Sequence, residues 1–438
     1  MSTIEIDLGG GAKLFVEPSN VLPLLSIVVA FRTGSAHDPA GKEGLSRVTA
    51  RMLRRGSAGL DAMETERAID RLGGEVSFEV AISSTAVGAQ VLARNATPFV
   101  DLLAKMIATP AFDEGELARL LRETRAELLE ALDNDRGLAD RFFRKKLFGT
   151  HGYGRTSRGT AASLGTLDRD AVRAHHQKHY VRENAIVAMS GDVDAAFAER
   201  LARTIVDALP RGAAPAEVLG EPTSITGRQL VFVDKPDRTQ TQILIGSLGT
   251  SAHDPDHVPL VVANNIFGGT FTSRLTREVR GKRGWSYGAS SRLGVDRRRH
   301  SFAMWTFPAA TDAAACVALE ISLLEKLLES GVTDREIKFM QRYISRSWAF
   351  EIDTAQKRVH QALDVEILGL PADYYAKYLE HVANVTAESA NAALRAHLDA
   401  KNLVVTVVGT AATTEGAVKA KIADLASDEV IAYDAESR

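Results

Sequence analysis

The residues best suited to chemistry lie in one stretch of the second half of the chain, Asn265–Ser290. This stretch turns through Gly268 and Gly269, continues as a basic helix-like run and leaves through Gly284 into a strand-like aromatic segment ending near Tyr287. The run carries three arginines at three-residue intervals: Arg274, Arg277 and Arg280. Guanidinium and phenol groups donate hydrogen bonds, so the stretch predicts a site that presents polar donors to a ligand.

Histidines are a second group with possible chemistry. His175 and His179 are four residues apart and would share one face of a helix, but no acidic residue lies suitably between them. We favour a packing or solvated role over metal binding for this pair. His253 and His257 flank Asp254-Pro255, and the proline makes one continuous helix through both histidines unlikely.

Length and composition indicate an ordinary globular protein. The 438 residues suffice for two or three domains at ~150 residues each, and 45% hydrophobic with 25% charged residues is typical of such chains. A formal net charge of -3 gives no reason to expect nucleic acid or an acidic membrane as the main partner.

Targeting signals are not evident. Cys316 is the only cysteine, so no internal disulfide can form, which suits a reducing compartment. The N-terminus lacks a basic-then-apolar signal pattern, and no apolar run approaches the roughly 20 residues of a membrane span. We expect a cytoplasmic protein, or a periplasmic one if a leader has been removed.

The sequence contains an internal repeat. The pentapeptide Ser35–Pro39 recurs as Ser251–Pro255, 216 residues later, and both copies follow a β-rich run. The strand-like segment Asn184–Gly191 parallels Asn402–Gly409, 218 residues later. Two matches in the same order at nearly the same offset indicate a duplicated domain.

The repeat and the composition divide the chain. We predict an N-terminal domain over 1–212, a linker over 213–227 with prolines and small residues, and a homologous C-terminal domain over 228–438. Adjacent strand-like runs alternate with helical runs in each half, so we expect an α+β fold with antiparallel-rich sheets covered by helices. The glycines at 9–11 precede a strand and predict a hairpin turn. The predicted elements of the first half are strands at 13–16, 25–31, 75–81, 85–92 and 185–189 and helices at 44–55, 62–72, 96–108, 114–134, 138–147 and 169–179.

The helix after the first pentapeptide carries a family resemblance. Its frame, Gly-Leu, six residues, Met-Leu, two residues, Gly-Ser over 44–57, resembles the first helix of the zinc peptidases that include insulin-degrading enzyme, pitrilysin and mitochondrial processing peptidase. His151–Arg155 is similar to that family's His-Pro-Tyr-Gly-Arg. The similarity covers nearly the whole chain, and the duplication is what that family shows.

The resemblance also shows what this chain lacks. Active members carry His-x-x-Glu-His on this helix, and the matching residues here, which we call the three vacated positions, are Arg47, Ala50 and Arg51. Arginine has no lone pair for zinc and alanine cannot act as a base. Glu127 stands near the place of the family's third zinc ligand. We favour an exposed helix carboxylate for Glu127, with an ion pair to Arg47 or Arg51 as the alternative.

The same resemblance gives the opening stretch a role. The family's C-terminal half contributes an arginine and a tyrosine that face the zinc across the substrate, and Arg280 and Tyr287 occupy those positions here. The resemblance places Gly268 and Gly269 in the short form of the family's glycine loop, next to substrate. The first half's Gly74–Phe78 stands where active members have a substrate-aligning edge strand, but the usual composition of that strand is absent.

The resemblance therefore implies a non-catalytic subunit of a heterodimeric zinc metallopeptidase that hydrolyses peptides. We expect no metal or other cofactor in this chain, and zinc in a homologous partner subunit that bears His-x-x-Glu-His. Arg280 and Tyr287 would act in the partner's site. Two alternatives stay open: a structural or scaffolding homologue, like the core subunits of respiratory complexes, and a peptide-binding module without proteolysis.

Overall fold

The computed structural model describes residues 3–57, 59–214 and 219–436, and these form two compact units. Unit 1 comprises Met1–Leu128, Thr156–Val218 and Ala349–Ala372, and unit 2 comprises Leu129–Arg155, Leu219–Trp348 and Asp373–Arg438. Residues 215–218 of the predicted linker lie outside the described residues.

The sheet of unit 1 has six strands in the order β1-β2-β6-β3-β5-β4. β2 and β6 run parallel, and the other neighbours are antiparallel. The strands are β1 Ile4–Gly9, β2 Ala12–Pro18, β3 Leu24–Phe31, β4 Gly74–Val80, β5 Thr85–Leu92 and β6 Ala185–Gly191.

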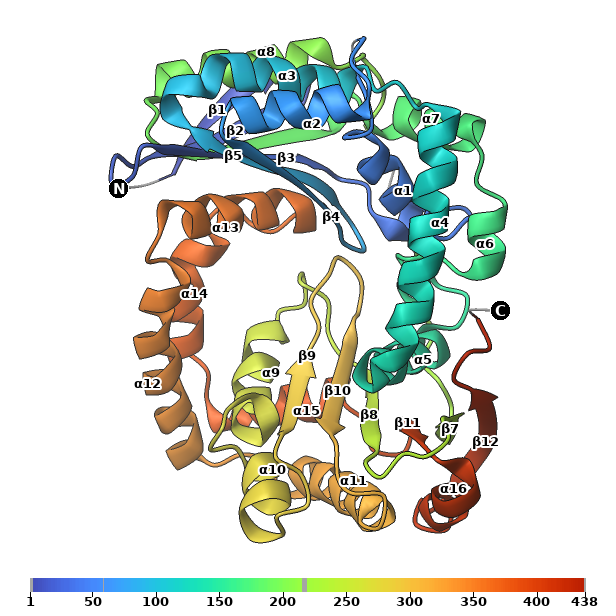
Figure 1. The fold of residues 1–438 in the computed structure, drawn as a ribbon. Helices are drawn as coiled ribbons and strands as arrows, with labels where there is room; N and C mark the ends of the chain where they lie inside the picture. The colour runs from blue at the N-terminus through green and yellow to red at the C-terminus, as the bar shows by residue number, and fades with distance from the viewer. Residues whose placement is uncertain (1–2, 58, 215–218, 437–438) are drawn as a thin grey trace. The chain divides into compact units, whose positions relative to one another are not determined.

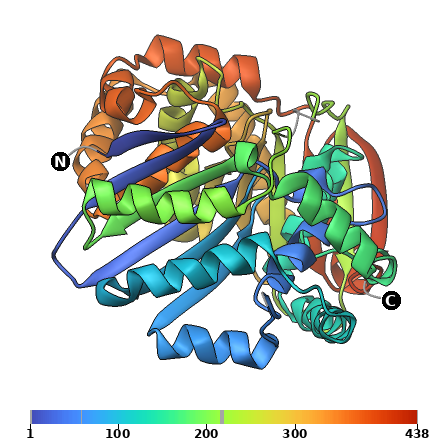
Figure 2. The same ribbon diagram turned by 90° about the horizontal axis from the view of Figure 1, so that it is seen from above.

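Helices cover both faces of this sheet. Its helices are α1 Leu45–Met52, α2 Ala62–Arg71, α3 Ala96–Ala108, α4 Glu114–Glu130, α6 Ala161–Gly165, α7 Arg169–His179, α8 Ala195–Ala208 and α13 Ala355–Leu368. α2, α3 and α8 lie over one face (Figure 1), and the view from above shows them side by side across the strands (Figure 2). α13 packs against β2 and β6 on the other face.

Alternation along the strands explains the two covered faces. On β3, Val29 and Phe31 belong to the large core that includes α3 and α8, whereas Val28 and Ala30 pack with Val359 of α13. Successive side chains of a strand point to opposite faces, so a strand covered on both sides reads as a continuous apolar run, as β3 does.

Unit 2 repeats the plan with its own sheet, in the order β12-β7-β11-β8-β10-β9. β7 runs parallel to β11 and β12, and the remaining neighbours are antiparallel. The strands are β7 Arg228–Asp234, β8 Gln242–Leu248, β9 Ala289–Leu293, β10 Ser301–Thr306, β11 Val404–Gly409 and β12 Leu425–Ala432. The helices are α5 Asp135–Phe148, α9 His257–Asn264, α10 Arg274–Thr276, α11 Ala313–Ser330, α12 Asp334–Glu351, α14 Tyr374–Ala383, α15 Ala387–His397 and α16 Ala411–Lys419.

Each unit takes one helix from the other half of the sequence. α5 precedes the predicted linker but packs on β7, β8 and β11 of unit 2. α13 follows the linker but packs on the sheet of unit 1. The compact units therefore differ from the sequence halves at 1–212 and 228–438 by these helical segments.

The predicted α+β fold class, with two sheets covered by helices, is confirmed. The glycines at 9–11 form the turn of the β1–β2 hairpin, each with positive φ. The sequence analysis missed β1 itself. No helix within the described residues is long and apolar enough to cross a membrane.

Candidate functional site

The three vacated positions lie on α1 of unit 1, as expected. The helix begins after Gly44, whose φ of 95° is a left-handed conformation that favours glycine. The buried carboxylate of Asp38 accepts hydrogen bonds from the Gly44 and Ser46 amides at 2.9 and 2.8 Å and thereby satisfies the start of α1. Burial raises the pKa of Asp38 to about 6. In the first copy of the repeated pentapeptide, the aspartate thus binds backbone amides at the start of a helix.

Glu127 on α4 forms ion pairs with the arginines at two of the vacated positions, Arg47 and Arg51. Its carboxylate lies 3.2 Å from the guanidinium of Arg47 and 2.8 Å from that of Arg51. Arg51 also donates to the hydroxyl of Thr124 at 3.3 Å. The Glu127 side chain is 33% exposed, as a carboxylate on the helix surface, and the ion pair that the sequence suggests with Arg47 or Arg51 is present with both residues.

The ion pairs continue along the two helices. Arg55, four residues after Arg51, binds Glu116 at 3.1 Å and Glu123 at 2.6 Å, both on α4. Arg47 and Arg51 share a face of α1, and Arg55 lies in the turn just after that helix, so the three arginines meet three glutamates of α4. We call this set the arginine ladder; it consists of Arg47, Arg51, Arg55, Glu116, Glu123 and Glu127.

The arginine ladder does not fit zinc. A catalytic zinc site needs three protein ligands with lone pairs, and only Glu127 offers one at this place. The base position is Ala50, whose buried methyl group has no proton chemistry. Cationic guanidinium groups at both former histidine positions would also repel a metal ion. The ladder joins α1 and the turn after it to α4 by ion pairs.

The edge strand β4, which contacts α1, has part of its unpaired backbone edge occupied by a side chain. β4 is the last strand of its sheet, so one side of its backbone has no strand partner. The carbonyl oxygen of Val76 accepts a hydrogen bond of 2.9 Å from Arg54, which also binds the carboxylate of Glu66. A peptide strand adding to this edge would have to displace Arg54. This agrees with the doubt that the sequence raises about substrate alignment here.

The Arg280 guanidinium of unit 2 lies between two aromatic rings. Its central carbon is 4.2 Å from the centre of the Tyr287 ring and 4.6 Å from that of Phe271. Both rings are well exposed, Tyr287 at 76% and Phe271 at 71%. No carboxylate among the described residues pairs with Arg280. The rings orient the cation while its N–H groups remain available to a ligand.

The polypeptide on either side of α10 positions this cluster. Two short π-helical turns, Asn265–Gly269 and Arg277–Lys282, flank α10, and such turns are frequent at functional sites. Gly268 is buried, and a Cβ there would come within 2.6 Å of the backbone nitrogen of Ser291 on β9. The close approach of β9 therefore requires a glycine at position 268. Gly269 is exposed.

Other features of the stretch differ from expectation. Trp285–Tyr287 is not a strand, because β9 begins at Ala289. The Ser286 hydroxyl donates to the Gly288 carbonyl and accepts from the Phe307 amide, and these bonds replace a strand ladder. Arg274 is not available to a ligand, because it makes two hydrogen bonds to Glu336 at 2.8 and 2.6 Å.

Four histidines are buried: His175, His176 and His179 in unit 1 and His257 in unit 2. His175 and His179 have the predicted packing role: their rings lie 4.5 Å apart, and burial is the main cause that lowers both pKa values, that of His179 to about 4. In unit 2, Nδ1 of His257 forms a hydrogen bond of 2.8 Å with the Thr250 hydroxyl. Burial lowers the pKa of His257 to about 4 as well. These rings are neutral at neutral pH.

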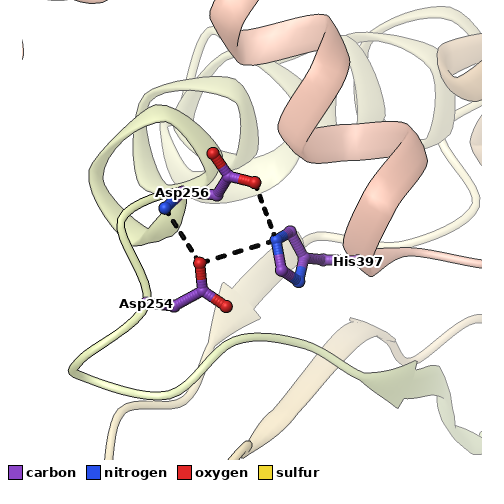
Figure 3. A group of neighbouring side chains, drawn as sticks. All are labelled: Asp254, Asp256 and His397. Atoms are coloured by element: carbon purple, nitrogen blue, oxygen red, sulfur yellow. Dashed lines mark hydrogen bonds and ion pairs between the residues drawn. The ribbon is translucent and has the colours of Figure 1, made fainter.

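A cluster with metal-ligand chemistry lies elsewhere in unit 2 (Figure 3). His397 Nε2 is 3.0 Å from Asp256 and 3.6 Å from Asp254. Asp256 stands at the start of α9 and His397 at the end of α15, where an acid and a base respectively complement the helix dipoles. A hydrogen bond between His397 and Asp256 joins the two helix ends, and the sequence analysis did not identify this cluster.

Comparisons with known proteins identify the family. Residues 18–161 match the family model of insulinase, peptidase family M16, and residues 166–343 match the model of the peptidase M16 inactive domain. These two matches together span most of the chain, so the protein belongs to peptidase family M16. The vacated positions and the arginine ladder make it a member without the zinc site of its own first helix.

Among the relatives of similar length, some are named zinc proteases and one is named a non-peptidase homolog. The chain is 23% identical over 361 residues to the uncharacterized zinc protease YmxG of Bacillus subtilis, covering 82% of this chain and 86% of that protein. It is 20% identical over 393 residues to the non-peptidase homolog YmxG of Helicobacter pylori, covering 90% of each.

Solved structures show the same fold. A peptidase M16 inactive domain from Pseudomonas fluorescens superposes with a TM-score of 0.86 at 26% identity, covering 93% of this chain and 98% of that one. A chain of complex III2 from Candida albicans superposes with a TM-score of 0.78 at 16% identity, covering 96% and 100%.

Sequence reasoning missed several residues of these sites. It did not identify Phe271, whose ring contacts the Arg280 guanidinium as that of Tyr287 does. An aromatic residue among threonines just before a basic run is a signal that was available for it. Arg54 and Arg55 were placed in a helix that ends earlier, at Met52, and their partners are distant in sequence.

Proposed function

We propose that this chain is the non-catalytic subunit of a heterodimeric zinc metallopeptidase and that Arg280 and Tyr287 act in the active site of its partner. The observation that carries the proposal is the Arg280 guanidinium, which is ordered by two exposed rings and has no described carboxylate partner. An arginine that two rings hold in place and that has no carboxylate partner can donate its N–H groups to a substrate or a partner protein. Membership of peptidase family M16 and the loss of the zinc donors at the vacated positions support the same conclusion.

The chemistry of the pair fits peptide hydrolysis. Attack of water on a peptide carbonyl places negative charge on the carbonyl oxygen, and preorganised donors stabilise that charge. The N–H groups of Arg280 and the phenol of Tyr287 are such donors, with the phenol exposed beside the guanidinium. The partner would be a homologue that bears His-x-x-Glu-His, and that subunit would hold the zinc.

Peptide hydrolysis by the reconstituted pair tests the proposal. Arg280→Ala and Tyr287→Phe should each lower kcat by about 10²–10³, the cost of removing one oxyanion donor. Lys282→Ala is a matched control, because Lys282 is an exposed cation of the same turn that binds Glu278. Size-exclusion chromatography should show intact pairs for all variants. Undiminished turnover with either test variant would refute the role.

A peptide-binding module without proteolysis is the second candidate. A groove of about 610 Å³ in unit 1 is lined by β3, β4 and β5 and by α13, on the face of the sheet where α13 packs. Glu75, Ser77 and Glu79 of β4 line one side, and His360 of α13 lines the other. The name of the H. pylori relative, a non-peptidase homolog, also favours a role without hydrolysis. Tight binding of unfolded peptides by this chain alone, with no hydrolysis in any pairing, would support this candidate.

The third candidate is a scaffolding role. The likeness to a chain of complex III2 supports the shared fold alone. A stable complex with other subunits that lacks peptidase activity would favour it over the other two.

A further inference from the structure

A groove of about 350 Å³ in unit 2 runs between the start of α10 and one side of α12. We call it the α12 groove. Thr270 and Thr272 line it from the segment before α10, and Phe339 and Met340 line it from α12. Both helices belong to unit 2 and are labelled in Figure 1. The bidentate Arg274–Glu336 pair joins the two elements and fixes the width of the groove.

The α12 groove is strongly positive. Arg277, Arg335 and Arg342 line it, and no carboxylate among the described residues pairs with any of the three. The one acidic lining residue, Glu336, is neutralised by Arg274, and its hydrogen bonds from Arg274 and Thr333 overcome burial and lower its pKa to about 2. A chain with a net charge of -3 thus has a local excess of unpaired arginines here.

Exposed aromatic rings accompany the arginines. Phe339 is 50% exposed and Tyr343, one turn further along α12, is 49% exposed. Exposed Arg346 continues the same row, and the acidic residues of α12 lie at its ends. Arginine, tyrosine and phenylalanine are the residue types enriched in protein interfaces and in their hot spots.

We propose that the α12 groove and the aromatic row beside it bind an acidic segment of a partner protein. Unpaired arginines recognise carboxylates, frequently with two hydrogen bonds, and Phe339 and Tyr343 offer apolar anchors. A polypeptide fits better than nucleic acid, because the net negative charge of the chain opposes a polyphosphate while the groove floor includes the buried apolar residues Ile266 and Met340.

The surface is continuous with the Arg280 cluster. Phe271 lies between the two groove threonines in sequence and stacks on Arg280. A partner that meets Arg280 would therefore come close to the α12 groove, although the groove's own charge and aromatics carry this inference without any catalytic role for Arg280.

Fluorescence anisotropy with the full chain tests the proposal. The probe is a short labelled helical peptide with glutamates and leucines on one face, and its matched form carries glutamine at every glutamate. We expect the glutamate peptide to bind more tightly, and the affinity to fall as salt rises. Arg335→Glu with Arg342→Glu should weaken binding by about two- to thirtyfold, the sum of two exposed ion pairs.

The control is Arg395→Glu on α15, which makes the same charge change at an exposed arginine outside the groove. Its affinity for the peptide should equal that of the wild type. Equal binding of the glutamine peptide, equal weakening by Arg395→Glu, or preference for a single-stranded DNA probe would each overturn the proposal. Circular dichroism confirms that the variants fold.

The same variants separate this inference from the proposed function. If the charge reversals leave both peptide binding and pairing intact while Arg280→Ala still lowers turnover, only the groove proposal fails. If Arg280→Ala has no effect while the charge reversals abolish peptide binding, only the catalytic role fails.

Discussion

The arginine ladder predicts the effect of removing its central carboxylate. Glu127→Gln keeps the shape of the side chain but leaves the guanidinium groups of Arg47 and Arg51 without a counter-charge. Hydrogen bonds to charged groups contribute about 1.5–3 kcal/mol each when buried, and exposed ion pairs contribute about 0.2–1 kcal/mol. All three side chains are a quarter to a third exposed, so screening reduces the larger figure. We therefore expect a loss of about 1–2 kcal/mol for the two contacts together.

Urea unfolding followed by circular dichroism measures this loss. For a unit of this size, 1 kcal/mol corresponds to a shift of about 2–4 °C in Tm, so calorimetry should show the unit 1 transition lowered by about 2–8 °C. The control is Glu130→Gln, at an exposed site at the end of the same helix, with an expected change within about 0.5 kcal/mol.

A double-mutant cycle assigns the effect to the ion pair. Combining Glu127→Gln with Arg51→Gln should cost less than the sum of the single changes, because each single change already removes the contact. Stability of Glu127→Gln equal to that of the wild type, or a coupling energy of zero, would refute the ladder as an energetic link between α1 and α4.

Two further predictions concern the vacated site and the buried histidines. Arg47→His, Ala50→Glu and Arg51→His in one protein should create a site for one zinc ion by calorimetric titration, because Glu127 already faces both arginine positions, and adding Glu127→Gln should weaken that binding. The pKa of His257 is lowered to about 4, below 6.5, so its share of stability is complete above pH 6.5 and is lost as the pH falls toward 4. The stability difference between wild type and His257→Gln should thus shrink by on the order of 1 kcal/mol between pH 7.5 and 5.5, and a difference that is independent of pH would contradict the assignment.

Local sequence patterns were enough for much of the fold. The strand at 85–92 and the helices at 96–108 and 169–179 have the predicted bounds, because hydrophobic period and capping residues are local signals. His175 and His179 lie on a helix as predicted, and their burial agrees with the packing role. The repeat predicted two related sheets, and both are present.

Long-range packing was not predictable in the same way. α5 and α13 pack on sheets from the other half of the sequence, and no property of their own residues records which sheet they cover. The partners of Arg55 lie more than 60 residues away on α4. Only the spatial meeting of α1 and α4 shows that the charges compensate each other.

The sequence predicted which residues form the Arg280 cluster only in part, and it did not predict the side chains that surround them. Residue spacing selected Arg280 and Tyr287, but the second ring, Phe271, depends on how the chain turns before α10. Gly268 was predicted to contact substrate and that stays a prediction; its close packing against β9 could not be foreseen from the sequence.

The turnover number of the reconstituted pair tests the central claim most directly. The partner is a His-x-x-Glu-His homologue at saturating concentration of this chain, and the comparison is wild type against Arg280→Ala. The account predicts that kcat falls by about 10²–10³ while assembly of the pair is unchanged. Equal kcat for both pairs, with assembly confirmed, would contradict the claim that this chain completes its partner's active site.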